Sequence, residues 1–228
     1  MPKPLVIAHR GDPTHGLENS LNAFRLALSV PVDMIEFDVR KGRDNTLYIM
    51  HDRDTGRTAD RNINIERATA DEIARVRLKN GEPIPTLRDV LAEVAGAAAL
   101  NIEIKSKGAG ALVAEHLKGS GYQGNVVLSS FQEREVIDAQ RALSGVQVAG
   151  IFDTFIPPEI SAYQRKGYRF ISLNRKTVTR ELVALLHDQG IKVYVWTVDD
   201  DSEMKELISW NVDGIYSNDP VRLRKVVG

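Results

Sequence analysis

Two histidines that end short apolar runs could form the acid–base pair of a catalytic site. His9 ends the run 5–9, and His51 lies near the end of the run 46–52. Imidazole titrates near neutral pH, so it can both accept and donate a proton under ordinary conditions. A lone histidine more often has a structural role. The catalytic interpretation therefore depends on both residues sharing a site with other polar groups.

Three carboxylates on two apolar runs could supply those groups. Residues two apart on a strand share a face, so Glu36 and Asp38 point the same way. Glu103 and Lys105 share a face for the same reason. A buried carboxylate is costly unless it is paired or bound to a cation. Two alternatives remain open: the carboxylates bind Mg²⁺ or Ca²⁺, or they form salt bridges with Lys105 and Arg10.

Three further side chains could contact a substrate. The guanidinium of Arg10 can bind phosphate oxygens through two parallel hydrogen bonds, and the ammonium of Lys105 can act as a point charge. Trp196, in the run 192–198, could form a flat apolar wall. Arg10 and Lys105 together suit an anionic ligand such as a phosphate.

Short β-rich runs alternate with amphipathic helical patterns and must position these residues. The expected strands are 5–9, 34–39, 100–105, 125–129, 146–152, 168–173, 192–198 and 213–217. Strands that alternate with helices indicate βα units and a parallel sheet, and eight such units are the number in a TIM (β/α)8 barrel. That fold places catalytic groups at the carboxyl ends of its strands, where His9 and Trp196 would lie.

The run 46–52 would be a ninth strand, because no helix separates it from 34–39. A short connector rich in turn-forming residues predicts a hairpin. If the turn centres near Arg43 and Asp44, His51 lies roughly opposite Glu36 and joins the carboxylates.

A polar segment from about 53 to 85 follows this hairpin. It holds one short helical pattern, which Thr69 and Glu72 would cap. We expect a small insertion after the second strand, within a single domain spanning 1–228.

Composition limits the classes of partner. The 30 basic and 31 acidic residues nearly cancel, so the chain as a whole does not attract nucleic acid. No apolar run approaches the roughly 20 residues that span a bilayer. The absence of cysteine excludes disulfides and thiolate catalysis. The start of the chain lacks a long apolar leader, which predicts a cytoplasmic protein; a homo-oligomer is possible.

Eight short motifs occur in one order along the chain: AHRG, ENS, IEFDV, MHD, NIEIK, SSF, VWTVDD and DGIYSNDP. In this combination the sequence closely resembles the glycerophosphodiester phosphodiesterase family over essentially its whole length. The resemblance implies a TIM barrel with a small insertion after the second strand. It also implies hydrolysis of a glycerophosphodiester to glycerol 3-phosphate and an alcohol. The chain departs from the family pattern after the HD dipeptide, where it reads HDRDTGRTADRN.

The resemblance also implies roles for individual residues. The acid–base pair would be His9 and His51. One divalent cation, Mg²⁺ or Ca²⁺, would be bound by Glu36, Asp38 and Glu103. The substrate would be contacted by Arg10 and Lys105 at its phosphate and by Trp196 near its glycerol end, in a site shaped by Glu18 and Asn19.

Three other functions compete with this one. A lysophospholipase D or sphingomyelinase D-like enzyme could use the same site, but it needs an apolar lip for an acyl chain. The polar segment 53–85 favours a small soluble head group instead. A Schiff-base lyase using Lys105 is less compatible with Glu103 two residues away. A phosphate-ester sensor without activity would not need both histidines and all three carboxylates.

Overall fold

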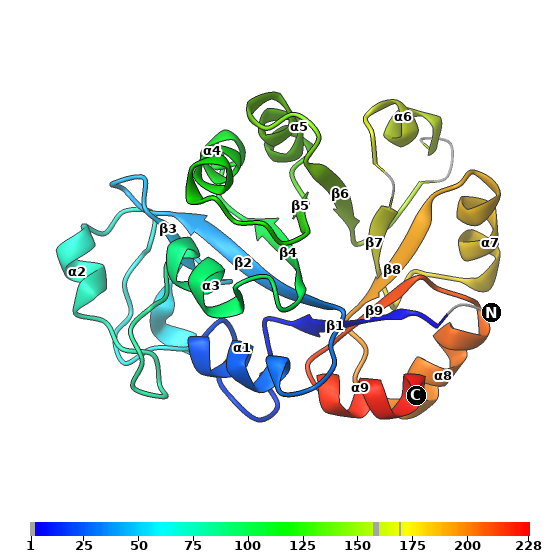
Figure 1. Ribbon diagram of the computed structural model, residues 1–228, viewed down its shortest axis with the longest axis horizontal. Coiled ribbons are helices and arrows are strands. Elements are labelled where there is room, and N and C mark those ends of the chain that lie inside the picture. The colour runs from blue at the N-terminus through cyan, green and yellow to red at the C-terminus, as the bar shows by residue number, and fades with distance from the viewer. Residues whose placement is uncertain (1–2, 157–159, 169) are drawn as a thin grey trace.

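Eight parallel strands and their helices close into a barrel in the computed structural model, which describes residues 3–156, 160–168 and 170–228 (Figure 1). Around the barrel each strand pairs with the next, and the last pairs with the first. The strands are β1 (Leu5–His9), β2 (Met34–Lys41), β4 (Ala99–Ile104), β5 (Val126–Ser130), β6 (Gln147–Phe152), β7 (Phe170–Asn174), β8 (Lys192–Trp196) and β9 (Gly214–Ser217). This confirms the TIM barrel. Of the expected strand 168–173, residue 169 lies outside the described residues.

Helices surround the barrel on its outer side (Figure 1). They are α1 (Leu21–Leu28), α3 (Leu87–Val94), α4 (Gly110–Ser120), α5 (Glu133–Ala142), α6 (Ile160–Arg165), α7 (Arg180–Asp188), α8 (Asp201–Ser209) and α9 (Pro220–Val227). Short polar residues begin several of them; for example, the side chain of Asp200 accepts hydrogen bonds from two backbone N–H groups of α8. Within the described part of the chain, no helix is long and apolar enough to cross a membrane.

Alternation along each strand divides the core in two. Outward-facing residues such as Phe37 and Ile102 pack against the helices in one large apolar cluster. Inward-facing residues fill the lower barrel, where Ile7, Phe170 and Tyr194 belong to a second cluster. Towards the carboxyl ends of the strands the inward positions become polar. The fold therefore provides a packed apolar base with a polar mouth above it.

The ninth strand, β3 (Leu47–Ile49), pairs antiparallel with β2 and confirms the hairpin. Its register differs from the expected one: Val39 lies opposite Ile49, so the turn centres on Asp44 and His51 does not face Glu36 across the hairpin. The loop has three residues and ends at Asn45, whose φ of +65° is left-handed. Such a loop is one residue longer than a two-residue turn and shifts every cross-strand pair by one.

The segment after the hairpin forms a small insertion between β3 and α3, drawn in cyan beside the barrel in Figure 1. It contains the short 3₁₀-helix η1 (Thr55–Arg57) and α2 (Ala70–Ala74). Thr69 and Glu72 form the expected capping box at the start of α2. A separate apolar cluster that includes Ile65 holds the segment together.

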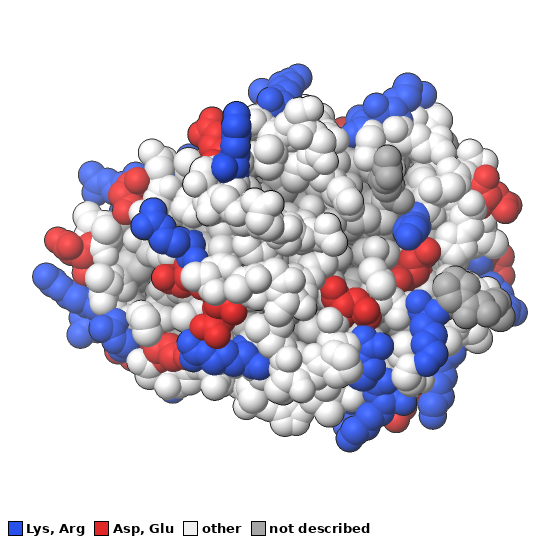
Figure 2. Space-filling model, in the orientation of Figure 1, with Lys and Arg blue, Asp and Glu red and all other residues white. Residues whose placement is uncertain are grey.

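Charged side chains are interspersed on the face seen in Figure 2, where Lys and Arg lie among Asp and Glu around the rim. No broad region of one sign covers that face, as the near-zero net charge would lead one to expect.

Candidate active site

The barrel brings the three carboxylates and His9 to one place. His9, at the end of β1, lies opposite Glu36 on β2, and Asp38 lies opposite Glu103 on β4. One oxygen from each of the three carboxylates lies within 4.8 Å of the others. Residues that are up to 94 positions apart in the chain, His9 and Glu103, thus meet at the mouth, because the strands β1, β2 and β4 are neighbours in the sheet.

Burial and mutual repulsion shape the charge of this cluster. Burial raises the pKa of Glu36 well above its ordinary value, and Asp38 raises it further. The pKa of Glu103 is raised to about 7 by the same two causes. Burial acts on Asp38 as well, but Arg10 and Lys105 outweigh it and lower the pKa of that carboxyl to about 2. Full ionisation of all three carboxylates is therefore unfavourable without added positive charge, which a bound cation would supply.

The cluster fits a divalent cation. Glu36 Oε1 and Asp38 Oδ1 are buried and accept no hydrogen bond from any residue that the structure describes. Lys105 Nζ lies 2.7 Å from Glu103 Oε1 and 3.5 Å from Asp38 Oδ1, so salt bridging occurs, as one alternative from the sequence held. These salt bridges do not reach Glu36 Oε1, which has no hydrogen-bond donor among the described residues. Carboxylate oxygens are the ligands that Mg²⁺ and Ca²⁺ prefer.

His9 is fixed by an amide. Its Nδ1 lies 2.8 Å from Asn218 Oδ1, and Asn218 Nδ2 in turn donates to Asp199 at 2.7 Å. Because an amide oxygen can only accept a hydrogen bond, the ring proton lies on Nδ1 and Nε2 is unprotonated. Nε2 lies 3.9 Å from Glu36 Oε2. Burial and then Arg10 lower the pKa of His9 to about 4. His9 is therefore neutral at pH 7.

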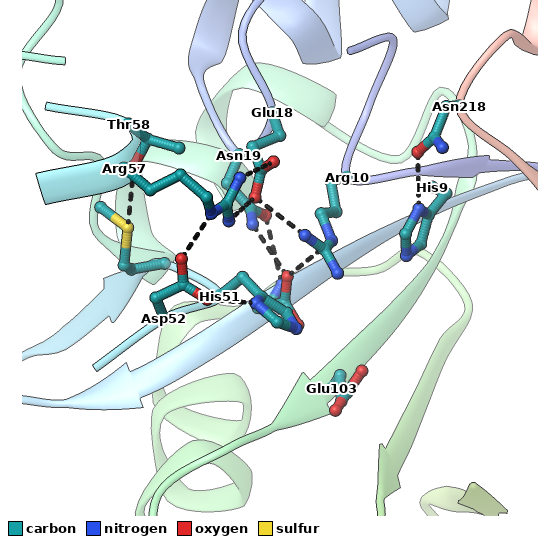
Figure 3. A network of polar contacts seen from close by, with 12 residues as sticks. His9, Arg10, Glu18, Asn19, His51, Asp52, Arg57, Thr58, Glu103 and Asn218 are labelled. Carbon is teal, nitrogen blue, oxygen red and sulfur yellow. Dashed lines mark hydrogen bonds and ion pairs between the residues drawn. The ribbon is translucent and has the colours of Figure 1, made fainter. Parts of the chain in front are cut away.

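His51 reaches the site from the end of the hairpin and is fixed by a carboxylate (Figure 3). Its Nδ1 lies 2.7 Å from Asp52 Oδ1. The buried guanidinium of Arg40 donates to the carbonyl oxygen of His51 at 2.9 and 2.5 Å and pairs with Glu66 of the insertion at 3.0 Å. Burial lowers the pKa of His51, and Asp38 opposes this effect.

Arg10 follows β1 in a sharp left-handed turn. Its φ is +58°, and that of Gly11 is +86°. A Cβ at Gly11 would lie 2.8 Å from the backbone of Ala23, so glycine is required for this close approach. The turn lets Arg10 N donate to Glu36 at 2.9 Å while its guanidinium donates to Glu18 at 2.9 Å.

Asn19 also has a left-handed backbone, with φ of +58°. Its side-chain Nδ2 donates to Asp38 Oδ2 at 2.8 Å. The first two residues of the ENS motif therefore contact site residues: Glu18 holds Arg10, and Asn19 holds Asp38.

A cavity of about 270 Å³ opens among these groups. Its walls are His9, Arg10, Glu36, His51, Asn101, Glu103, Lys105, Phe131, Ile151, Ser172, Trp196, Thr197 and Tyr216. Trp196 packs edge-on against Phe131, with 5.6 Å between ring centroids, and forms an apolar wall. A wider hollow of about 550 Å³ beside Tyr122 shares no wall residue with this cavity.

Sequence reasoning missed several residues that hold the site. Asn218 and Asp199 lie in two of the quoted motifs but were given no role. Phe131, the aromatic residue of the SSF motif, was overlooked in the same way. Arg40 carried one signal, because it lies two residues after Asp38 on β2 and so shares the face of Glu36 and Asp38.

Comparison with known proteins agrees with this geometry. The model of the glycerophosphoryl diester phosphodiesterase family matches residues 9–222. The chain belongs to this family. It is 30% identical to the glycerophosphodiester phosphodiesterase of Caldanaerobacter subterraneus subsp. tengcongensis, over 99% of this chain and 98% of that protein.

Solved structures share the fold of this family member. A glycerophosphodiester phosphodiesterase from Parabacteroides distasonis superposes with a TM-score of 0.88 at 27% identity, covering 99% of this chain and 97% of the other. An Oleispira antarctica phosphodiesterase, solved with its product sn-glycerol-3-phosphate, gives a TM-score of 0.92 at 20% identity over 99% and 97% of the two chains.

Proposed function

We propose that this chain hydrolyses glycerophosphodiesters to glycerol 3-phosphate and an alcohol, with a divalent cation. One observation carries the proposal: two histidines with tethered Nδ1 atoms and three clustered carboxylates meet at one cavity in a member of this family. A histidine pair suits proton transfer, and the carboxylate cluster suits a cation.

Glu36, Asp38 and Glu103 would hold one Mg²⁺ or Ca²⁺ ion. When bound, the cation supplies positive charge that stabilises the phosphoryl oxygens during bond cleavage. Arg10 and Lys105, which line the cavity, would bind phosphate oxygens and orient the diester.

His9 and His51 would transfer protons through Nε2, because each Nδ1 is tied back to Asn218 or Asp52. One histidine takes a proton from the nucleophile. Attack by water gives glycerol 3-phosphate directly, whereas attack by the neighbouring glycerol hydroxyl gives a cyclic phosphate that water must then open. The other histidine gives a proton to the oxygen of the leaving alcohol. Each transfer is typically worth about 10²–10⁴-fold in rate.

The remaining residues would shape the site. Glu18 and Asn19 fix Arg10 and Asp38 through the hydrogen bonds described above. Trp196 would contact the glycerol end of the substrate. Its buried indole N–H has no acceptor among the described residues, so it is available to a substrate hydroxyl.

A second candidate is a lysophospholipase D or sphingomyelinase D-like activity. Phe131 favours it, because this ring is 45% exposed beside Trp196 and could support an acyl chain at the cavity. No residue of the insertion 53–85 lines the cavity, and the two insertion side chains that contact site residues, Arg57 and Glu66, are charged.

The two candidates are separated by their substrates. We expect the protein to release glycerol 3-phosphate and choline from glycerophosphocholine. Faster release of choline from lysophosphatidylcholine than from glycerophosphocholine would favour the second candidate. No release from either substrate by folded, cation-supplied protein would contradict both.

A further inference from the structure

Arg57 links two parts of the site without lining its cavity (Figure 3). It belongs to η1, in the insertion. Its Nε donates to Asp52 Oδ2 at 2.6 Å. Its Nη1 and Nη2 donate to the two oxygens of Glu18 at 2.6 and 2.7 Å. All three guanidinium nitrogens are thus engaged by carboxylates, which makes substrate binding an unsuitable role.

Each of these carboxylates also contacts a residue of the cavity wall. Asp52 uses its other oxygen, Oδ1, to hold His51 Nδ1 at 2.7 Å. Glu18 Oε1 also accepts from Arg10 Nη1 at 2.9 Å. Arg57 therefore fixes Asp52 from behind, and Glu18 anchors Arg57 to the loop that follows β1.

The insertion determines where Arg57 lies. The hydroxyl of Thr55, which is fully buried, donates to the carbonyl oxygen of Arg61, and Thr55 N donates to Ile63. These contacts close the loop around η1 and leave its arginine directed at Asp52.

We propose that Arg57 is a positioning residue: through Asp52 it holds the His51 ring with Nε2 towards the cavity. The proposal rests on the function proposed above. The side chain of Arg57 is 48% exposed, and ion pairs so exposed contribute little to stability. Its effect should therefore be on turnover. Lysine cannot replace Arg57 fully, because its single ammonium group lacks the rigid, planar set of donors with which a guanidinium bridges two carboxylates.

Steady-state kinetics of Arg57→Ala and Arg57→Lys test this role. We expect kcat to fall about 10²-fold in Arg57→Ala, the usual effect of a small misplacement of a reacting group. KM should change much less. The kcat of Arg57→Lys should lie between that of the wild type and that of Arg57→Ala. The control is Arg61→Ala, which removes an exposed arginine of the same loop that forms no ion pair in the described structure and should leave kcat unchanged.

A double variant asks whether Arg57 acts through Asp52. In the Asp52→Asn background, Arg57→Ala should cost no further kcat. Independent losses that multiply in the double variant would overturn the proposal, as would an Arg57→Ala protein with wild-type kcat.

The ¹⁵N NMR shifts of His51 give a readout that needs no substrate. In the wild type we expect a single tautomer protonated at Nδ1, and in Arg57→Ala a mixture of tautomers. An unchanged tautomer would contradict the proposal. If wild-type protein shows no turnover, the proposed function fails, and the tautomer result still decides the role of Arg57.

Discussion

The two histidines of the site are held by chemically different partners. His9 faces the neutral amide of Asn218, whereas His51 faces the carboxylate of Asp52. Both arrangements place the proton on Nδ1 and leave Nε2 unprotonated, the atom that we propose transfers protons. Only the carboxylate can stabilise an imidazolium, so the two rings should differ in how readily they retain a proton.

Removing either ring should abolish turnover without unfolding the protein. We expect His9→Ala and His51→Ala each to lower kcat by at least the roughly 10²-fold associated with one proton transfer. Glycerol 3-phosphate release measures the loss, and circular dichroism checks the fold. The control is His15→Ala, since His15 is half exposed and contacts Asp12 outside the cavity. Near wild-type kcat in a His9 or His51 variant would remove that residue from the mechanism.

The role of a site residue could be predicted where the alternation of side chains along a single strand indicated it. Glu36 and Asp38 were recognisable because two carboxylates two apart on an apolar strand share a face. Asn218 and Arg57 were not, because their roles depend on partners from distant segments. Nothing local distinguishes an arginine that fixes Asp52 from one that lies in solvent.

At the scale of elements, one buried carboxylate joins two helices beside the site. Glu135 of α5 accepts hydrogen bonds from Gly108 N, Ala109 N and Gly110 N at 2.8, 2.9 and 2.8 Å. These N–H groups begin α4, which has no side-chain cap of its own. Glu135 therefore caps its neighbour and fixes the loop that follows Lys105.

Replacing this carboxylate should destabilise the fold. We expect Glu135→Ala to lower the free energy of unfolding by about 3 kcal/mol, because it leaves buried N–H groups without their charged acceptor. Chemical denaturation measures the change. Glu115→Ala, on the exposed face of α4, is the matched control and should have little effect. Equal stability of the two variants would show that the cap contributes nothing.

Elements were easier to predict than their register. The hairpin of β2 and β3 followed from a short connector between two apolar runs. Its pairing depended on whether the loop had two or three residues, and the left-handed backbone of Asn45 decided that. His51 nevertheless reaches the cavity, because it lies beyond β3, where the chain is free of the sheet register.

At the scale of the whole molecule, the carboxylate cluster should make stability depend on pH. The folded-state pKa of Glu103, about 7, lies above its ordinary value of 4.5, so folding favours its protonated form. That contribution is fully present below about pH 4.5 and is lost as pH rises through 7. Glu36 shifts in the same direction. A bound cation favours the ionised carboxylates and should reverse the loss.

We therefore expect that adding Mg²⁺ or Ca²⁺ to protein stripped of metal with a chelator raises its melting temperature more at pH 8 than at pH 5. Differential scanning calorimetry measures both values. In Glu103→Gln this difference should shrink, because the variant side chain does not titrate. A cation effect that is equal at both pH values would contradict the assignment of these carboxylates.

The overall architecture could be predicted from the sequence because it depends on the order of strands and helices along the chain. Eight apolar runs with helices between them can close only by pairing neighbours, and closure brings distant strand ends together. We infer that residues 53–85 are an insertion into one domain spanning 1–228. What the insertion contributes to the site could not be foreseen, because its Arg57 and Glu66 act through contacts across loops.

The most direct test of the central claim is turnover of glycerophosphocholine by protein that has been stripped with a chelator. We predict that stripped protein releases no glycerol 3-phosphate, and that adding back Mg²⁺ or Ca²⁺ restores release. Glu36→Gln should stay inactive under the same conditions, since it lacks a ligand of the cluster. Equal release with and without chelator would contradict a cation-dependent phosphodiesterase at this site.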